Sequence, residues 1–289
     1  LPDKSQNLLI NLHLLNDIRR LNQYMIACSD KIKPGGMLFG CFIPLARDRQ
    51  RLRSKMPKLI FKIIYPLYFI FYRILPKLPK IRHLYFILTK GRGRVVSKAE
   101  MLGRLSFCGY KVTAEKIIDN TLYFIAQKLS TISTEKEPSY SSIVRLKRVG
   151  LDGNLINIYK FRTMHPYSEF IQKEIFEHNS LDPSGKIKDD FRLTNWGIIL
   201  RKLWIDELPQ LYNWVRGDIT LVGVRPLSEH YFSLYPKDLQ ELRTSFKPGL
   251  IPPYYADMPK EFNEVIESER RYLQRKQEKQ YSTDILYFT

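Results

Sequence analysis

Residues 188–226 decide the fold of the C-terminal half, and they read KDDFRLTNWGIILRKLWIDELPQLYNWVRGDITLVGVRP. Apolar residues at helical spacing predict a short helix over 198–203. A second helix is predicted to begin at Asp206, with Glu207 in its first turn, and to stop at Gly217. The stretch therefore predicts two short helices with an Asp-Glu pair between them.

The Asp206-Glu207 pair has two interpretations. At a helix N-terminus the positive end of the dipole lowers carboxyl pKa values and keeps both groups ionised. Two adjacent anions together with an oxygen-rich substrate form a natural Mg²⁺ site, because this ion binds carboxylate and phosphate oxygens. The alternative is structural: Asp206 caps the helix and Glu207 is solvated.

A hairpin precedes this stretch at residues 145–164, RLKRVGLDGNLINIYKFRTM. Its turn contains Asp152-Gly153, a pair that accepts positive φ. Side chains alternate along a strand, so Lys160 and Arg162 are expected on one face. Two cations on one face can hold a diphosphate, whereas a solvated edge strand is the alternative for the pair alone.

Six blocks in this half occur in the order of one known family. They are KRVG (147–150), YKFRTM (159–164), DFRLTNWG (190–197), LRKLWIDELPQLYNWVRGD (200–218), LVGVRP (221–226) and KPGL (247–250). On these residues the chain resembles the bacterial sugar transferase family, the monotopic phosphoglycosyl transferases that start polyprenyl-linked glycan assembly. The resemblance covers most of residues 145–250.

The resemblance implies an enzyme of two steps at the cytoplasmic face of the inner membrane. Asp206 would attack the sugar-linked phosphorus of a UDP-sugar, releasing UMP and leaving a covalent sugar-phosphate intermediate. Polyprenyl phosphate, of the undecaprenyl type, would then accept the sugar phosphate, which initiates surface polysaccharide or glycolipid assembly. Glu207 would bind Mg²⁺ with Asp206 or help to activate the acceptor.

Phosphoryl transfer depends on positioning and charge neutralisation, for which guanidinium groups are suited. The candidate phosphate-binding residues are Lys160, Arg162, Arg192, Arg201 and Arg225. Arg192 has a structural alternative, an ion pair with Asp190. The histidines have no metal-ligand spacing, so none receives a role.

Three features depart from the family pattern. Val224 replaces the first Pro of the family's Pro-Arg-Pro, and residues 251–255 replace its Thr-Gly-Trp. The family's Pro-broken re-entrant membrane helix lies shortly before the Arg-Val-Gly block. Here the comparable stretch, Ile63 to Tyr72, lies about seventy residues earlier. Either this stretch folds back to the catalytic domain, or the chain contacts the membrane in another way. A third alternative is that the protein works as a homo-oligomer or with a membrane partner.

Net charge is concentrated upstream. The chain carries 47 basic and 29 acidic residues, a formal +18, and residues 47–98 hold fifteen basic residues and one acidic residue. Within them, segment 57–94 combines these charges with aromatic and aliphatic residues. Lys62 and Arg73 bracket only ten uncharged residues, fewer than the roughly 20 of a spanning helix. Interfacial or re-entrant contact of this segment with a membrane is therefore expected, and a buried helix is the alternative. A nucleic acid is not expected as a partner.

Composition sets the frame for the N-terminal half. The 289 residues, 44% of them hydrophobic, suffice for two domains and exclude disorder, while three separated cysteines argue against a disulfide framework or zinc site. The chain begins at Leu1, as expected for a fragment of a longer protein. The order of the predicted elements in this half resembles the C-terminal half of a class I methyltransferase-like fold. It is a helix, a Lys-Pro-Gly-Gly turn at 33–36, a strand, a second helix and a hairpin. The glycine-rich cofactor loop of that fold has no counterpart, so methyl transfer is not expected.

The predicted fold class is α/β with two domains. An incomplete methyltransferase-like α/β region, residues 1–130, is followed by a linker at 131–142 and a compact α+β phosphoglycosyl transferase domain with membrane-associated helices at 143–289. A catalytically impaired membrane scaffold of the same fold is the alternative function. Retention of both Asp206 and Glu207 among cations favours the enzyme.

Overall fold

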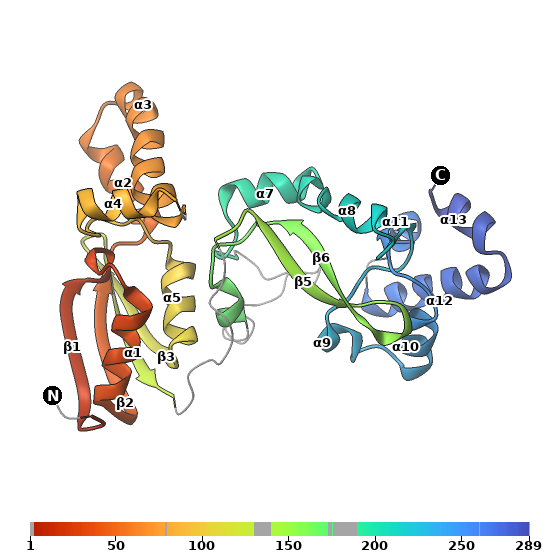
Figure 1. Ribbon diagram of the computed structural model, residues 1–289, viewed down its shortest axis with the longest axis horizontal. Coiled ribbons are helices and arrows are strands. Elements are labelled where there is room, and N and C mark those ends of the chain that lie inside the picture. The colour runs from red at the N-terminus through yellow and green to blue at the C-terminus, as the bar shows by residue number, and fades with distance from the viewer. Residues whose placement is uncertain are drawn as a thin grey trace. The chain divides into compact units, whose positions relative to one another are not determined.

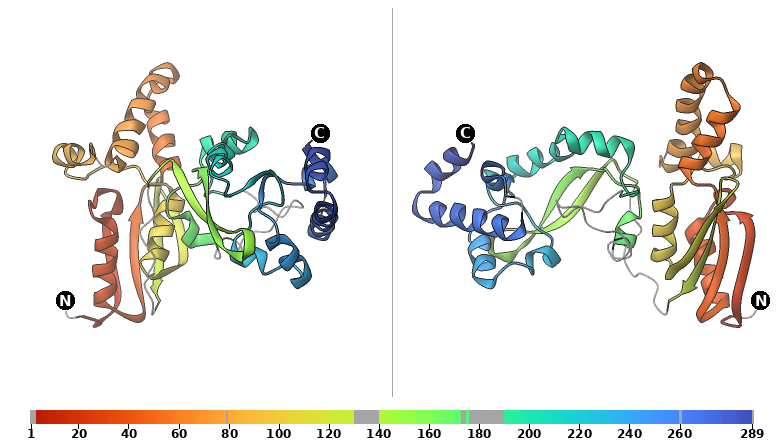
Figure 2. Two further views of the ribbon diagram at one scale, coloured as in Figure 1. Left: turned by 45° about the vertical axis from the view of Figure 1, so that its right-hand side comes forward. Right: turned by 180° about the vertical axis from the view of Figure 1, so that it is seen from behind.

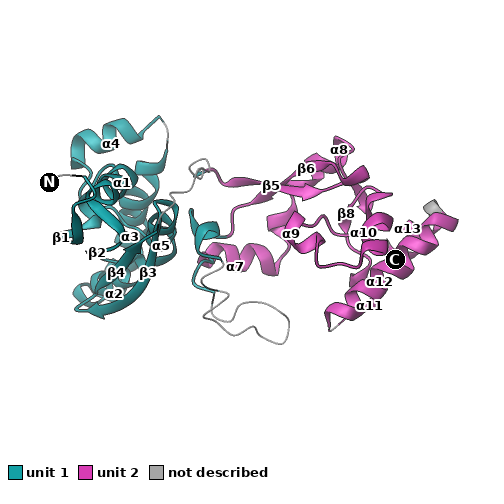
Figure 3. Cartoon of the chain, turned by 90° about the horizontal axis from the view of Figure 1, so that it is seen from below, with its two compact units in different colours: residues 1–140, 164–180, 187–193 teal, residues 141–163, 181–186, 194–289 magenta. Residues whose placement is uncertain are grey.

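The computed structural model describes residues 3–78, 80–129, 140–172, 175, 190–259 and 261–288. The predicted mixed α/β class is confirmed. The chain divides into two compact units, of which unit 1 contains residues 1–140, 164–180 and 187–193 and unit 2 contains residues 141–163, 181–186 and 194–289 (Figure 3). Residues 131–139 of the predicted linker lie outside the described residues, so that boundary stays a prediction.

Unit 1 is built on a four-stranded sheet with the order β1-β2-β4-β3 (Figure 1). The strands are β1 (Gln6–Leu14), β2 (Ile32–Phe42), β3 (Tyr110–Ile118) and β4 (Thr121–Lys128). β1 and β2 are parallel and are connected through η1 (Leu15–Asp17) and α1 (Leu21–Lys31), whereas β4 pairs antiparallel with both β2 and β3. The predicted β3–β4 hairpin is therefore present.

The prediction of a turn at 33–36 was wrong. These residues belong to β2, with Gly35 at a φ of +79°, and the register of β1 against β2 shifts between Gln6 and Leu8. An irregularity in pairing accommodates the Pro-Gly-Gly sequence within the strand instead of reversing the chain. The strand β1 had no predictable signal, because most of its side chains are exposed and they do not alternate strictly.

The core of unit 1 lies between one face of the sheet and two helices, α1 and α5 (Lys98–Phe107). Met25, Leu105 and Phe124 are among its fully buried members. The sequence SKAE at 97–100 has the Ser-x-x-Glu spacing of a helix start, and Ser97 caps α5 by accepting a hydrogen bond from the Glu100 backbone N–H at 3.2 Å. A 3₁₀ turn, η5 (Ser168–Ile171), packs on the same helix, because Gly103 lets the Tyr167 backbone approach it closely.

The basic segment of unit 1 forms further helices (Figure 2). They are α2 (Leu45–Lys55), α3 (Lys58–Phe69), the π-helical η2 (Ile70–Ile74), the 3₁₀ turn η3 (Leu75–Lys77) and α4 (Arg82–Thr89). Lys58–Lys77 is the one helix in the described part of the chain that is long and apolar enough to cross a membrane, by length and composition alone, and 11% of its most apolar window is buried. The alternative of a buried core helix was therefore wrong.

Unit 2 carries the hairpin β5 (Ile143–Val149) and β6 (Leu155–Phe161) and the parallel pair β7 (Thr220–Val222) and β8 (Gly249–Ile251). Asp152 and Gly153 take φ values of 54° and 74° in the turn η4 (Leu151–Gly153), as predicted. The helical elements are α7 (Asn195–Lys202), η6 (Ile205–Glu207), α8 (Gln210–Val215), α9 (Glu229–Phe232), α10 (Lys237–Thr244), α11 (Tyr254–Asp257), α12 (Phe262–Glu278) and α13 (Gln280–Phe288).

The core of unit 2 forms around α10, α12 and the end of β7, where Leu239, Tyr272 and Leu273 are fully buried. Tyr272 donates its hydroxyl proton to one of two acceptors, the Val222 carbonyl at 3.2 Å or the Asp284 carboxylate at 2.6 Å. The helix α12 thus supports strand β7, which continues into residues 223–226.

Candidate active site

Asn213 fixes α8 against strand β6. Its side chain is completely buried; Oδ1 accepts from the Tyr159 backbone N–H at 3.0 Å, and Nδ2 donates to the Asn157 carbonyl at 2.7 Å and to Asp218 at 2.9 Å. A buried amide with its partners in place holds two elements in one register. Lys160, on the same strand, is thereby held near the start of α8.

Asp206 and Glu207 lie in a 3₁₀ turn between α7 and α8. The predicted end of the first helix near Trp204 is confirmed, and that residue has a φ of 56°, which reverses the chain direction. The second helix begins later than predicted, at Gln210, so Asp206 does not cap α8. The Asp206 side chain is buried, with a residue exposure of 8%, whereas Glu207 is half-buried.

Glu207 is the acceptor at the centre of a charged cluster. Lys160 Nζ donates to Glu207 Oε1 at 2.5 Å, and Arg225 Nη2 donates to the same oxygen at 3.4 Å. Burial and the Arg225 charge lower the pKa of Lys160, an effect that the nearby carboxylates Glu207 and Asp206 oppose. The cluster holds a cation in a partly desolvated position, where a substrate phosphate would be bound strongly.

A cavity of about 60 Å³ opens beside this cluster. It is smaller than the roughly 300–1,000 Å³ typical of small-molecule sites, so it accommodates a group the size of a phosphate and not a whole nucleotide sugar. Its lining residues are Arg148, Ile158, Lys160, Glu207, Gln210, Arg225, Pro226, Gly249, Leu250 and Pro252. Asp206 does not line it but precedes Glu207 directly in the chain.

The loop that carries Arg225 is held without the family's first Pro. Val224 is buried in the unit 2 core, and Arg243 Nη2 donates to the Arg225 carbonyl at 2.6 Å. Arg243 is itself buried and ion-paired with Glu269. The hydrogen bond from Arg243 therefore restrains the Arg225 backbone, and the pair with Glu269 holds Arg243 in place.

The remaining predicted phosphate-binding residues lie outside the lining of this cavity. Arg162 donates from Nε to the Ser141 carbonyl at 2.9 Å, and Arg201 donates from Nε to the Thr163 hydroxyl at 3.0 Å. Arg192 is buried and makes a bidentate pair with Asp190 at 2.8 and 2.7 Å, as its structural alternative predicted. Arg192 belongs to unit 1, whereas the Lys160–Glu207 cluster belongs to unit 2.

Three contributors were not predicted from the sequence. Arg148 and Gln210 line the cavity, and Tyr254 accepts from Arg225 Nη1 at 3.1 Å. Burial and the Arg225 charge lower the pKa of Arg148. Arg148 lies within the KRVG block, so its motif was visible, but its direction depends on the pairing of β5 with β6. The sequence around Tyr254 carried no signal, because it departs from the family pattern.

A strongly apolar surface runs along α7, η6 and α8 beside the cluster. The three Trp side chains at 196, 204 and 214 are 74%, 62% and 44% exposed, which excludes a core role for them. Trp204 stacks on Tyr255 with ring centroids 4.8 Å apart. The other exposed members are Ile198, Ile199, Leu203, Leu208, Leu211, Tyr212 and Val215. Contiguous apolar exposure on this scale is typical of a membrane or protein contact.

The carboxylates fit Mg²⁺ only as a partial site. No group of three or more His, Cys, Asp or Glu side chains gathers among the described residues. Mg²⁺ is commonly held by one or two protein carboxylates together with substrate phosphates and water. Both cationic contacts of Glu207 fall on Oε1, so Asp206 and the Oε2 atom of Glu207 are the ligands that the chain can offer.

Comparison with known families identifies the class of protein to which this chain belongs. The family model of the bacterial sugar transferases matches residues 117–288, more than half of the chain. The chain belongs to this family, which confirms the predicted relationship.

Individual relatives share the same region. The chain is 42% identical over 110 residues to the galactosyl transferase CpsE of Streptococcus agalactiae, covering 38% of this chain and 24% of that protein. It is 40% identical over 120 residues to the uncharacterized sugar transferase EpsL of Bacillus subtilis, covering 38% and 52%. It is 37% identical over 109 residues to the undecaprenyl-phosphate galactose phosphotransferase of Salmonella typhimurium, covering 36% and 23%. The matches thus span between about a quarter and a half of these relatives.

One solved structure is similar to part of the chain. An O-methyltransferase family 2 protein from Planctomyces limnophilus matches 43% of this chain and 30% of its own, with 12% identity and a TM-score of 0.25. A similarity at this score carries no argument about fold. The methyltransferase-like character of the N-terminal half therefore stays a prediction.

Proposed function

We propose that the protein transfers a sugar 1-phosphate from a UDP-sugar to polyprenyl phosphate, through a covalent intermediate on Asp206. The observation that carries this proposal is the convergence of Lys160 and Arg225 on Glu207, directly beside Asp206. Cations next to a carboxylate pair can neutralise a diphosphate while a carboxylate attacks it. A relative named undecaprenyl-phosphate galactose phosphotransferase supports the donor and acceptor classes.

In the first step a carboxylate oxygen of Asp206 attacks the sugar-linked phosphorus. The bond from this phosphorus to the bridging oxygen breaks, and UMP leaves with the electron pair. Lys160 and Arg225 bind the phosphate oxygens and stabilise the charge on the leaving group. In the second step an oxygen of polyprenyl phosphate attacks the same phosphorus, which releases the Asp206 carboxylate.

Asp206 and Glu207 would hold Mg²⁺ together with the substrate phosphates, and the ion would supply further charge neutralisation. The apolar surface on α7 and α8 would contact lipid, so that the prenyl chain reaches the cluster without leaving the bilayer. These roles correspond to a protein at the cytoplasmic face of the inner membrane.

The test is release of UMP and labelling of the protein. With a panel of UDP-sugars labelled at the sugar-linked phosphate, Mg²⁺ and no acceptor, the wild type should retain label, and added polyprenyl phosphate should discharge it into lipid. Asp206→Asn should abolish both, whereas Asp152→Asn, an exposed carboxylate in a turn that tolerates Asn, should behave as wild type. Folded protein that takes no label from any donor would leave the impaired scaffold as the function.

A further inference from the structure

A second, larger cavity lies in unit 1, with a volume of about 510 Å³. Its lining is strongly cationic, because six basic side chains face it and one acidic side chain, Glu100, does so. The basic residues are Arg19, Arg20, Lys77, Arg82, Arg94 and Arg104. The cavity belongs to one compact unit, and none of its residues takes part in the Lys160–Glu207 cluster.

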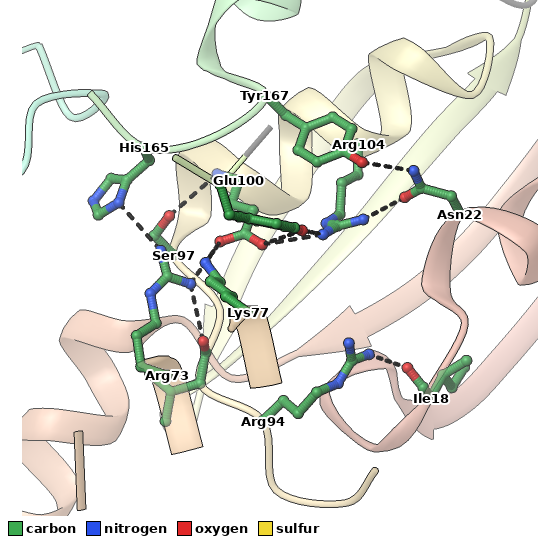
Figure 4. A network of polar contacts seen from close by, with 12 residues as sticks. Ile18, Asn22, Arg73, Lys77, Arg94, Ser97, Glu100, Arg104, His165 and Tyr167 are labelled. Carbon is green, nitrogen blue, oxygen red and sulfur yellow. Dashed lines mark hydrogen bonds and ion pairs between the residues drawn. The ribbon is translucent and has the colours of Figure 1, made fainter. Parts of the chain in front are cut away.

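Glu100 is shared among more cations than it can neutralise (Figure 4). Its side chain is 2% exposed; Oε2 accepts from Arg73 at 2.6 Å and from Lys77 at 2.8 Å, and Oε1 accepts from Arg104 at 3.2 Å. Burial alone would raise the pKa of Glu100, but these three charges hold it well below its ordinary value. One carboxylate thus faces three cations, two of which, Arg73 and Arg104, are more than nine-tenths buried.

Arg104 lines this cavity and has one buried donor, Nε, that its contacts leave unpaired among the described residues. Its guanidinium lies over the Tyr167 ring at 4.3 Å and donates to Asn22 and Tyr140, yet its Nε is buried with no hydrogen-bond partner among the described residues. The Nε of Arg94 is likewise buried without a hydrogen-bond partner among the described residues, and both arginines line the cavity. Buried charge without compensation is costly, and a bound anion offsets that cost.

We propose that the unit 1 cavity is a binding site for a phosphate-bearing anion. Guanidinium groups from different elements converge on the cavity, and such groups bind phosphate with paired donors. The volume lies within the range of small-molecule sites, which leaves room for more than the phosphate itself. The ligand supplies the negative charge that Glu100 cannot provide to Lys77, Arg104 and the other lining cations.

The phosphate can be free or carried by a lipid. Tyr72, Pro76 and Arg82 line the cavity from η2, η3 and α4. The same elements expose apolar side chains elsewhere, among them Ile87 at 74% and Leu88 at 67%. A headgroup phosphate in the cavity with its acyl chains on these side chains satisfies both features, and a soluble phosphate or diphosphate satisfies the first.

The test compares two charge-matched double variants of the whole chain. Arg20→Gln/Arg82→Gln removes two exposed cations that line the cavity, and Lys33→Gln/Lys111→Gln removes two exposed cations from β2 and β3, outside it. Because all four side chains are exposed, both variants should keep the wild-type melting temperature in chloride. Binding is measured with inorganic phosphate and diphosphate at matched ionic strength, and with phosphatidylglycerol against phosphatidylcholine vesicles.

Phosphate or diphosphate should raise the melting temperature saturably in wild type and in the β2/β3 variant, and the cavity variant should bind about 10- to 100-fold more weakly. If that selective loss appears only with phosphatidylglycerol vesicles, the bound phosphate is lipid-borne. Equal binding of every ligand by the two variants, or no saturable binding by wild type, would overturn the proposal.

Discussion

Lys160 and Arg162 provide the sharpest test of the active site, because both are candidate phosphate-binding residues and the structure gives them different surroundings. Both were predicted to lie on one face of the second hairpin strand as phosphate-binding cations, but β6 ends at Phe161, before Arg162. Lys160 contacts Glu207 at 2.5 Å and lines the cavity, while Arg162 donates to the Ser141 carbonyl. We expect Lys160→Gln to impair transfer and Arg162→Gln to be nearly neutral.

The magnitude follows from the environment of the ammonium group. The Lys160 side chain is 17% exposed and Glu207 is 24% exposed, so a phosphate contact there is partly desolvated. A hydrogen bond between charged groups in such a position contributes about 1.5–3 kcal/mol, which corresponds to roughly a 10- to 150-fold loss in kcat/KM. UMP release at limiting UDP-sugar measures the loss for both variants. A loss in Arg162→Gln equal to that in Lys160→Gln would refute the assignment, and so would full activity in Lys160→Gln.

Three further predictions concern stability, each measured by urea unfolding. Asn213→Leu should lower the free energy of unfolding by about 2–4 kcal/mol, because the Tyr159 N–H and the Asn157 carbonyl lose the fully buried side chain that pairs with both; a loss below 1 kcal/mol would contradict the role given to Asn213. Gly197→Ala should cost about 1–3 kcal/mol, since the added Cβ would lie 2.0 Å from the Thr163 carbonyl oxygen; a neutral substitution would show that the contact relaxes freely. Burial and the Arg73 charge lower the pKa of His165 to about 3, so the neutral ring is native and stability should fall as pH drops below about 6.5. His165→Gln should reduce the loss between pH 7 and 5 by about 1–2 kcal/mol, and an unchanged profile would exclude His165 as its cause.

Local chemistry explains what the sequence could predict. The Asp152-Gly153 turn, the Ser97 cap and the end of the helix before Trp204 each depend on a few neighbouring residues, and each is present. The six blocks likewise identified the family, which the match over residues 117–288 confirms. Backbone preferences and short motifs can be predicted from the sequence without knowledge of the tertiary fold.

Long-range pairing explains what the sequence could not predict. Arg201 binds Thr163, which lies 38 residues away in the sequence. Arg243, which binds the Arg225 carbonyl, lies 18 residues after it. Neither distance leaves a periodic signal in the sequence. The ion pair between Arg192 and Asp190 is the exception, because the two residues are two positions apart and the pair could be stated in advance as a structural alternative.

Arg73 shows how such a pairing changes the meaning of an apolar helix. In the sequence it marks the end of an uncharged block, but in the fold it is 5% exposed and paired with Glu100 inside unit 1. The end of the helix is thereby fixed within protein, and the apolar residues before it belong mainly to α3, which has 12 residues. The whole helical segment Lys58–Lys77 is long enough to span, but the part that precedes Arg73, residues 58–72, is about 22 Å long at 1.5 Å per residue, short of the roughly 30 Å hydrocarbon core. Because moving Arg73 into lipid would break a buried ion pair, contact of α3 with a membrane is compatible with an interfacial or re-entrant position and not with a straight span.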